Sequence, residues 1–273
     1  YYPPGRLFPD YARNGRPLSG YTNYGSVMQT EEYSTGFYSV HTWILPYVRA
    51  SHIYDMIDFN RAQRKRMENP RNINYEAYIK PMPLYLCPAD SNTEGRPTEN
   101  NYRYNFGGDT PGAGLKSFDR LDTMPSVFDQ WFVGGTGAFT IGLKGLSADQ
   151  FEDGLSQTVF FSERTKGNVG DPNQAPSETD MVRCRSGLSP AGSVERLFEL
   201  QDAVENQNSG FFRSAGRWPE GSDFSDGWPF GMYTATQYNH VAPPNWRRAD
   251  CGVSFISDTP QEHAIVAARS QHP

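Results

Sequence analysis

The stretch FEDGLSQTVFFSERTKG, residues 151–167, joins a turn signal to a strand-like run, and the rest of the chain can be interpreted outward from it. Asp153 and Gly154 indicate the turn, and the side chain of Ser156 or Thr158 is expected to bond the turn backbone. The run TVFFSE that follows is rich in β-branched and aromatic residues, which predicts a buried strand. We therefore predict a turn that leads directly into a strand of the sheet.

Glu163 and Arg164 lie where this strand should end. We expect a structural ion pair at this point, because charged residues are more often structural than reactive when no partner motif accompanies them. The less favoured alternative is a catalytic acid at Glu163. A hydrolase of that kind would need Glu163 or a serine within hydrogen-bond reach of a histidine such as His240.

Other segments predict further short elements. Pro46 suits a first helical turn, and apolar residues at helical spacing after it predict a helix over residues 46–57. One apolar face predicts a second helix in SVERLFELQDAVENQ, residues 193–207. Strands are expected at PLYLCP (83–88), NNYRYNFGG (100–108), GGTGAFTIG (134–142) and GVSFIS (252–257). These elements predict an α+β fold in one domain over residues 1–273, with an antiparallel sheet, few short helices and long Gly/Pro-rich loops.

The composition limits the kind of protein this can be. Aromatic residues make up 14% of the 273 positions, too many for a disordered chain, and 26 Gly with 21 Pro indicate many loops. The net charge of −6 argues against a nucleic-acid partner, which requires a basic face. No apolar run approaches the roughly 18 residues that a membrane-spanning helix needs. Contact with a membrane is therefore expected only through a helix that this sequence does not contain.

The motifs of common catalytic and metal sites are absent. There is no G-x-S-x-G elbow, no H-E-x-x-H pair and no phosphate-binding glycine loop. The three cysteines form no CxxC pair and no zinc spacing with the five histidines, of which His263 and His272 stand in the C-terminal tail. Cys87, which precedes a proline, is expected to be buried or disulfide-bonded. We predict no enzymatic activity, no cofactor and no metal.

The stretch GSDFSDGW, residues 221–228, contains the best candidates for ligand binding. Asp223 and Asp226 provide two carboxylates within it. Trp218 and Trp228 provide aromatic rings close by, and such a combination can bind a sugar or Ca²⁺. The favoured interpretation is a Gly/Asp turn with the tryptophans packed beneath it, because Ca²⁺ needs about six oxygens. A surface polysaccharide is the alternative ligand.

Several short segments follow one another along the whole chain in a characteristic order. They are YYPPG, HTWILPYVRASHIYDMIDFN, LYLCPAD, NYRYNFGG, GAF, FEDGLSQTVFFSER, GRWPEG, HVAPPNWRRADC and ARSQHP. This series resembles the planctomycete-type family known as the domain of unknown function 1559. Ala89 stands where that family has serine, and Gln157 stands where it has asparagine. The chain ends at Pro273, before the Gly-Gly and the closing strand of the family.

The resemblance implies a pilin-like globular head. Members of the family resemble type IV pilins and the pseudopilins of type II secretion, with a prepilin-type leader and a hydrophobic helix upstream of the head. We therefore expect a secreted, non-catalytic structural subunit of a surface filament or pseudopilus, whose partners are its own copies or other pilin-like subunits. The alternative is a cell-surface polysaccharide-binding module. Relatives also carry an upstream cysteine, and Cys184 with Cys251 is the disulfide expected within this chain.

Overall fold

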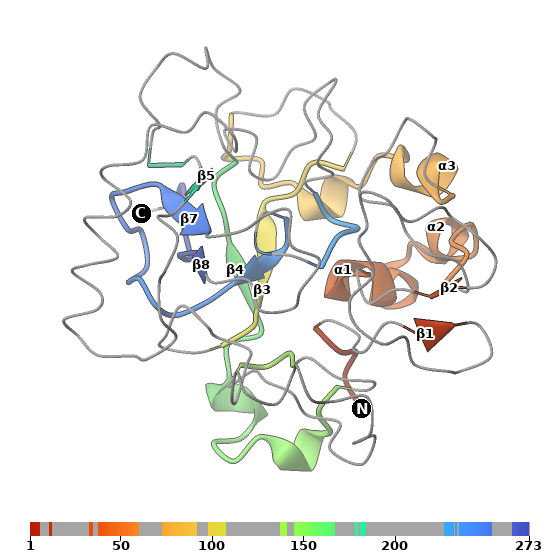
Figure 1. Cartoon of the computed structure of the whole chain (residues 1–273), viewed down its shortest axis with the longest axis horizontal. Coiled ribbons are helices and arrows are strands. Elements are labelled where there is room, and N and C mark those ends of the chain that lie inside the picture. Colours follow the sequence, from red (N-terminus) through yellow and green to blue (C-terminus); the bar gives the residue numbers. More distant parts are fainter. Residues whose placement is uncertain are drawn as a thin grey trace.

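The structure of the chain is a computed structural model with a mixed fold of small β-sheets and few short helices (Figure 1). It describes residues 1–5, 11–12, 33–34, 38–59, 73–91, 98–107, 137–140, 145–166, 178–179, 181–183, 227–231, 233, 235–252 and 264–272. Of residues 11–12, 33–34, 181–183, 251–252 and 264 it describes the backbone alone. The mixed content agrees with the predicted α+β class.

A three-stranded sheet lies at the centre of the described fold, in the order β4-β3-β6. β3 comprises Tyr102–Asn105, β4 Phe161–Glu163 and β6 Gln237–Tyr238. β4 runs antiparallel to β3 and places Glu163 opposite Tyr102, whereas β6 runs parallel to β3. The strands predicted in TVFFSE and NNYRYNFGG are thus confirmed. The predicted antiparallel sheet is instead mixed, because a long connection brings β6 back beside β3 in the same direction.

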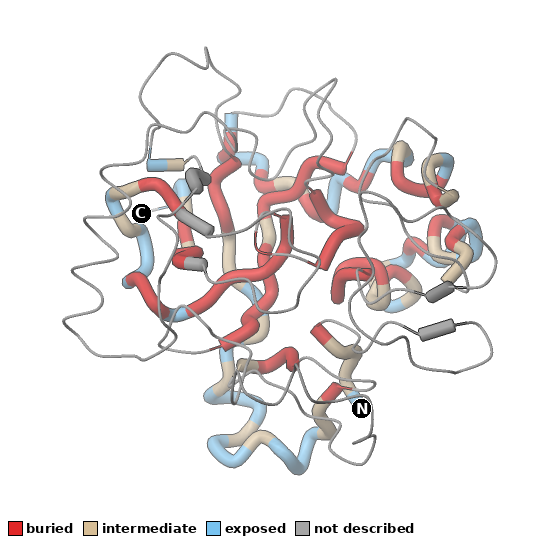
Figure 2. The backbone as a smooth tube through the Cα atoms, viewed as in Figure 1, coloured by how far each residue is buried: buried red, intermediate tan, exposed pale blue. Residues whose placement is uncertain are grey.

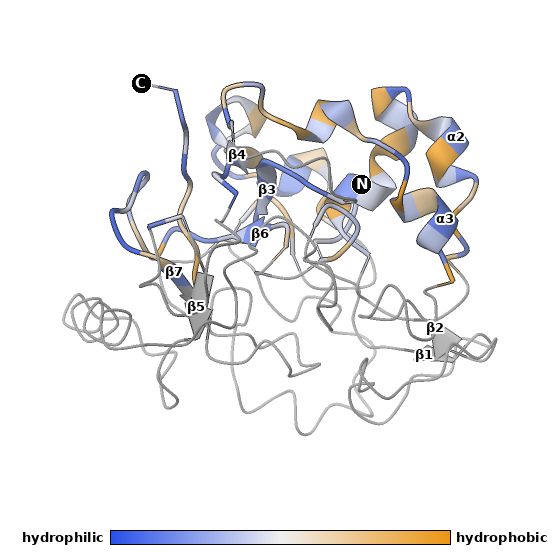
Figure 3. Cartoon of the chain, turned by 90° about the horizontal axis from the view of Figure 1, so that it is seen from above, coloured by the Kyte–Doolittle hydropathy of each residue, from blue (hydrophilic) through white to orange (hydrophobic). Residues whose placement is uncertain are grey.

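A second sheet has the order β5-β7-β8 and combines strands from late in the chain. β5 comprises Met181–Arg183, β7 Asp250–Gly252 and β8 Ala264–Ile265. β7 pairs parallel with β5 and antiparallel with β8. β1 (Tyr11–Ala12) and β2 (Tyr33–Ser34) form a separate antiparallel pair. In Figure 1 and Figure 3, strands β5 and β7 lie on one side of the central sheet and α2 and α3 on the other, so the central strands separate two halves.

The helix predicted over residues 46–57 is wrong as a continuous element. Two short helices cover this region, η1 (Leu45–Val48) and α2 (Ser51–Tyr54), and α1 (Val40–Trp43) lies just before it. Pro46 occupies the first turn of η1, where its fixed φ suits a helix start. Arg49 then adopts φ of 63°, and a left-handed residue ends a right-handed helix, so α2 must begin anew. No helix among the described residues is long and apolar enough to cross a membrane.

Two further helices complete this side of the molecule, α3 (Tyr75–Tyr78) and η2 (Pro83–Tyr85). η2 occupies the segment PLYLCP, for which the sequence predicts a strand. That prediction is wrong because Pro83 holds φ in the helical range at the first position of the turn. Residues 137–139 of GGTGAFTIG form bends and residue 140 is irregular, so this part is not a strand, and Gly252 of GVSFIS ends β7. The remaining residues of these two segments, and the helix predicted over residues 193–207, lie outside the described residues.

Aromatic side chains form much of the core, and Figure 2 shows buried backbone running through the central strands and α1. The buried aromatic members of the main cluster are Tyr38, Tyr78, Tyr85, Trp228 and Phe230. Trp228 packs edge-on against Tyr78, with ring centroids 5.5 Å apart. Ser39 caps α1 by accepting the Thr42 N–H at 3.2 Å, and its hydroxyl donates to the Trp228 carbonyl. Residues 227–230 are thereby fastened to the start of α1.

Gly227, directly before Trp228, can be tested as a position that only glycine fits. It adopts φ of 141°, and a Cβ there would stand 2.2 Å from the Thr98 carbonyl oxygen. We expect Gly227→Ala to lower the free energy of unfolding by roughly 2–3 kcal/mol, measured by urea unfolding. Gly154→Ala is the control, because Gly154 has φ of 80° but nothing within 4 Å of its Cβ position. Equal losses in the two variants would contradict a steric role for Gly227.

Candidate functional site

A turn precedes β4 and projects to the surface. Asp153 and Ser156 are exposed, and Gly154 adopts φ of 80°. Thr158 Oγ1 donates to the Gly154 carbonyl at 3.1 Å, so a side chain closes the turn. β4 itself is less buried than the sequence indicates, since the side chain of Phe161 keeps 38% exposure. The turn positions β4 beside β3 and contributes no reactive group to a site.

Glu163 and Arg164, at the end of β4, have different partners. Arg164 is buried, and its Nη1 donates to the Ala235 carbonyl at 2.5 Å. Glu163 reaches in the other direction, toward Ser270 and His272 near the end of the chain. Successive side chains of a strand point to opposite faces, which explains why these neighbours diverge. Glu163 therefore pairs with His272 rather than with Arg164.

Cys87, Glu163 and His272 converge on one point and form what we call the Cys-Glu-His cluster. One ligand-type atom from each lies within 4.8 Å of the other two. Cys87 Sγ is 3.3 Å from His272 Nε2, and the same Nε2 is 3.4 Å from Glu163 Oε1. Cys87 is buried, whereas the side chains of Glu163 and His272 are 25% and 53% exposed. The thiol of the cluster is therefore buried, whereas its carboxylate and imidazole are partly accessible to solvent.

The position of Cys87 is set by the turn Cys-Pro-Ala-Asp and by the residue before β3. The Asp90 N–H donates to the Cys87 carbonyl at 3.1 Å, which closes the turn. The Cys87 N–H donates to Asn101 Oδ1 at 2.9 Å, and the Asn101 N–H donates to the Tyr85 carbonyl at 2.7 Å. Asn101 therefore fixes the thiol-bearing turn against the central sheet.

A buried ionic network lies beneath this turn. Lys166 Nζ is 3.6 Å from Asp90 Oδ2, and the two side chains are 0% and 2% exposed. Asp90 Oδ2 also accepts the backbone N–H of Lys166 at 3.1 Å and Asn101 Nδ2 at 2.5 Å. Lys166 Nζ donates in addition to Asn101 Oδ1 at 3.2 Å. A buried charge pair supported by several hydrogen bonds holds one arrangement, so the network makes the Cys87 turn rigid.

The C-terminal segment brings His272 to the cluster. The Arg269 N–H donates to the Glu163 carbonyl at 2.9 Å, which aligns the segment with the end of β4. The Ser270 N–H donates to Asn245 Oδ1 at 2.9 Å, and the His272 N–H donates to Ser270 Oγ at 3.0 Å. Ser270 Oγ donates in turn to Glu163 Oε2 at 2.5 Å. Ser270 thus orients both the histidine and the carboxylate.

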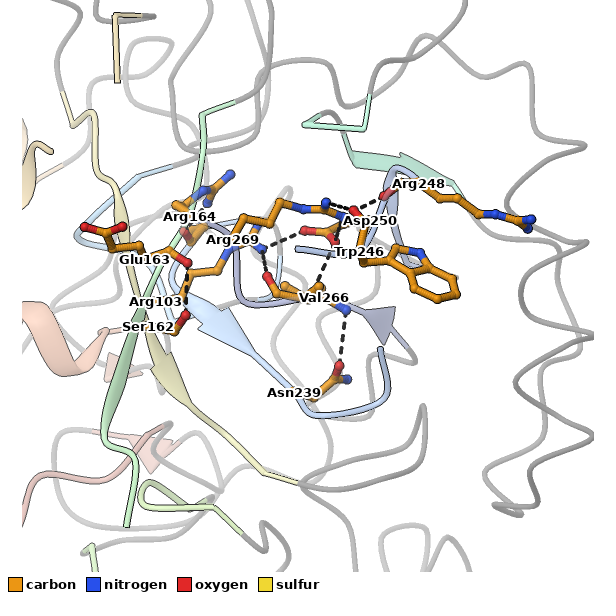
Figure 4. A network of polar contacts seen from close by, with 12 residues as sticks. Arg103, Ser162, Glu163, Arg164, Asn239, Trp246, Arg248, Asp250, Val266 and Arg269 are labelled. Atoms are coloured by element: carbon orange, nitrogen blue, oxygen red, sulfur yellow. Dashed lines mark hydrogen bonds and ion pairs between the residues drawn. The ribbon is translucent and has the colours of Figure 1, made fainter. Parts of the chain in front are cut away.

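Asp250 also holds the C-terminal segment in place, through ion pairs with two arginines (Figure 4). Arg103 Nη1 lies 2.7 Å from Asp250 Oδ2, and Arg269 Nη2 lies 2.8 Å from Asp250 Oδ1. Arg269 also donates to the carbonyls of Trp246 and Arg248. Burial by itself would raise the pKa of Asp250, but the charges of Arg269 and Arg103 outweigh it and hold that pKa below its usual value. The group is an ionic joint between β3, β7 and the C-terminal segment.

The geometry of the Cys-Glu-His cluster does not fit a nucleophile-base-acid triad. In such a triad one ring nitrogen of the histidine faces the nucleophile and the other faces the acid. Here Nε2 of His272 faces both Cys87 Sγ and Glu163 Oε1. Within the part of the chain that the structure describes, Glu163 is not paired with His240: Glu163 contacts Ser270, and the ring of His240 packs against Tyr238. Three donor atoms that converge on one point are instead the pattern of a metal site.

His41 on α1 is the other histidine with an unusual setting. Its ring packs edge-on against Tyr85 at 4.8 Å and against Phe161 at 5.7 Å between centroids. Neither ring nitrogen has a hydrogen-bond partner among the described residues. Burial lowers the pKa of His41 to about 3, so the ring is neutral at physiological pH. His41 therefore acts as a core side chain.

The residues proposed from the sequence for ligand binding do not come together in the described structure. Trp218, Asp223 and Asp226 lie outside the described residues. Trp228 is 1% exposed and packs against Tyr78 and Tyr85, so its ring offers no face to a sugar. The burial of Trp228 agrees with the favoured interpretation, in which the tryptophans pack into the protein.

The cysteines can be placed only in part. Cys87 is buried and free of any disulfide. Cys184 lies outside the described residues, and of Cys251 the backbone alone is described, in β7. The disulfide between Cys184 and Cys251 therefore stays a prediction.

Motif reasoning from the sequence missed the Cys-Glu-His cluster. Its three members are far apart along the chain, so no spacing rule for zinc sites connects Cys87 with His272. A signal was present, however, in the segments that carry the family resemblance. LYLCPAD contains Cys87, FEDGLSQTVFFSER contains Glu163, and ARSQHP contains His272.

Comparison with known proteins places the chain in a family. A family described as a protein of unknown function (DUF1559) matches residues 1–262, a range that includes Cys87 and Glu163 and ends before His272. No curated protein and no solved structure matches the chain. Since the match covers most of the sequence, the chain belongs to the DUF1559 family.

Proposed function

We propose that this chain is the non-catalytic globular head of a secreted, pilin-like structural subunit of a surface filament or secretion pseudopilus. The proposal rests on the ordered segments that resemble the pilin-like family and on the surface of the described fold. In such a subunit an upstream hydrophobic helix, exported with a prepilin-type leader, would form the filament core. The head would then contact other copies or related pilin-like subunits on the outside of the filament.

Exposed apolar side chains on two separate segments, which we call the helical patch and the strand patch, are the observation that carries the proposal. The helical patch contains Tyr47 on η1, 87% exposed, and Met56 after α2, 42% exposed. The strand patch contains Leu155, Val159 and Phe161, which are 41%, 51% and 38% exposed. Figure 1 places α2 at one side of the molecule and the segment before β4 below the central sheet. A helical assembly joins two different surfaces of each subunit, which is what two distinct patches can provide.

The polar clusters also favour a structural role. Asp90 with Lys166, and Asp250 with Arg103 and Arg269, tie distant segments together in the interior. These buried groups are engaged with one another, so they stabilise one arrangement of the head rather than supply a proton donor or acceptor to a substrate. A head with rigid internal joints can transmit contacts between subunits.

An acidic substitution in either patch should disrupt assembly. In the full-length precursor, Tyr47→Asp or Val159→Asp is expected to lower the amount of sedimentable filament at least about tenfold, because a charge buried without a partner costs several kcal/mol. Filament would be sheared from cells, pelleted and quantified by immunoblot. Both side chains are exposed, so circular dichroism of the head should be unchanged.

Lys80→Asp and Arg247→Asp are the matched controls, since both residues are exposed and lie outside the two patches. Each changes the charge by more than the test variants do and should leave assembly intact. Full assembly of both test variants would contradict the proposal. So would unchanged assembly after deletion of the upstream hydrophobic helix.

A further inference from the structure

We propose that the Cys-Glu-His cluster binds a Zn²⁺ ion through Cys87 Sγ, Glu163 Oε1 and His272 Nε2. The ion would join the Cys-Pro-Ala-Asp turn, the end of β4 and the C-terminal segment at one point. This inference does not depend on filament assembly, because a metal clamp of this kind stabilises the head whatever its partners are.

Two of the three separations between the donor atoms fit tetrahedral zinc. Bonds of about 2.3 Å to sulfur and about 2.0 Å to nitrogen, at a tetrahedral angle, place S and N about 3.5 Å apart. Bonds of about 2.0 Å to nitrogen and oxygen place those two atoms about 3.3 Å apart. The observed separations are 3.3 Å from Cys87 Sγ to His272 Nε2 and 3.4 Å from His272 Nε2 to Glu163 Oε1. These two separations match tetrahedral zinc to within about 0.2 Å. The third pair, Cys87 Sγ and the carboxylate oxygen of Glu163, lies within 4.8 Å, and rotation of the carboxylate would bring it to the required separation of about 3.5 Å.

Neighbouring groups hold these donors in orientations that leave the right atoms available. Ser270 Oγ binds Glu163 Oε2, so Oε1 is the carboxylate oxygen that faces the histidine. The backbone of Cys87 is fixed by Asn101, and that of His272 by Ser270. Groups of this kind, which orient ligands without touching the metal, are a regular feature of protein metal sites.

The donor types select zinc among the common divalent ions. Ca²⁺ and Mg²⁺ prefer sites made of oxygen alone, and a thiolate with an imidazole does not suit them. A thiolate and a carboxylate together carry two negative charges, which one Zn²⁺ neutralises. Among the described residues His272 is the only ion-pair partner of Glu163, so no arginine or lysine already provides that compensation.

The site has three protein donors and an open side. The 53% exposure of the His272 side chain gives an ion access from solvent, and a water molecule can fill the fourth position. The bound ion would add to the contacts that already hold the C-terminal segment, namely the Arg269 N–H on the Glu163 carbonyl and the Asp250 joint. We assign the ion a structural role, as a clamp on this segment.

Titration of untagged, chelator-treated full chain with Zn²⁺ tests the site directly. One equivalent should bind, measured by calorimetry, and Co²⁺ should give a thiolate-to-cobalt charge-transfer band. Cys87→Ser should abolish that band. His272→Ala should weaken Zn²⁺ binding at least about 100-fold, and Ser270→Ala should weaken it about tenfold through the orientation of Glu163 and His272.

The controls are His52→Ala and Glu152→Gln, because these residues are exposed and lie away from the cluster. They should bind Zn²⁺ like the unmodified chain. His272→Ala decides the matter even if Cys87→Ser fails to fold, since His272 is half-exposed at the end of the described chain. Failure of the unmodified chain to bind Zn²⁺, or equal affinity in the folded His272→Ala variant, would overturn the proposal.

Discussion

Asp250→Asn is expected to lower the free energy of unfolding by about 3–5 kcal/mol at pH 7, because it removes one partner of a buried ionic group. The carboxylate is 3% exposed and contacts both Arg103 and Arg269, whose side chains are 2% and 5% exposed. Asparagine has nearly the same size but no charge, so the attraction between this position and both guanidinium groups would be lost. Urea unfolding followed by tryptophan fluorescence measures the loss.

The dependence of stability on pH provides a second test of the ionic group formed by Asp250, Arg103 and Arg269. The pKa of Asp250 is held below its usual value of 3.8, so its charge stabilises the fold above that pH and loses this effect as the pH falls through the lowered pKa. The Asp250→Asn variant should lack this acid-dependent component. Asp153→Asn is the control, because Asp153 is exposed and should change stability by less than about 0.5 kcal/mol. A loss below about 1 kcal/mol in Asp250→Asn would contradict the structural role of the joint.

Because of His41, the free energy of unfolding should decrease markedly as the pH falls from 6 to 4. Its pKa is about 3 in the folded chain, against an ordinary value of 6.5. Between these values the unfolded chain binds a proton that the native state does not, so the free energy of unfolding falls as the pH falls. From pH 6 to pH 4 the expected decrease from this one group is about 2–3 kcal/mol.

The variant His41→Leu isolates this effect, since leucine has a similar volume and does not titrate. Among the described residues, the titratable groups that face the His41 ring are the phenols of Tyr85 and Tyr104, which stay neutral in this range. Asp250 contributes its change mainly below pH 3.8, so the two effects are separable. Urea unfolding at pH 4, 5 and 6 should show a weaker pH slope in His41→Leu than in the control His52→Leu. Identical slopes would show that the His41 ring is protonated in the native state.

Local sequence patterns predicted the central strands well and the helices poorly. NNYRYNFGG and TVFFSE contain alternating or β-branched residues, and they form β3 and β4. The predicted helix over residues 46–57 ignored Arg49, whose left-handed conformation ends η1. The segment PLYLCP has strand-like residues, yet Pro83 begins a 3₁₀ helix there. Periodicity describes which face of an element is apolar, but it does not show where the backbone reverses.

The sequence drew attention to individual residues of the Cys-Glu-His cluster, but it did not predict that they lie together. Glu163 was named as the end of a strand, and Cys87 as a buried or bonded thiol. Their neighbour His272 lay in a tail where no ligand spacing was visible, so the sequence indicated no metal. The structure joins them through hydrogen bonds of Ser270 and Asn101, which come from other parts of the chain.

The fold class, the loop-rich character, the family and two of the three central strands follow from the composition, from local propensity that acts over a few residues, and from the order of short segments along the chain. The parallel pairing of β6 with β3 and the meeting of Cys87, Glu163 and His272 do not follow from these signals. They depend on contacts between residues far apart in the chain. Such contacts form only when the core closes, because ordering the intervening chain costs entropy that packing and buried ionic joints must offset together.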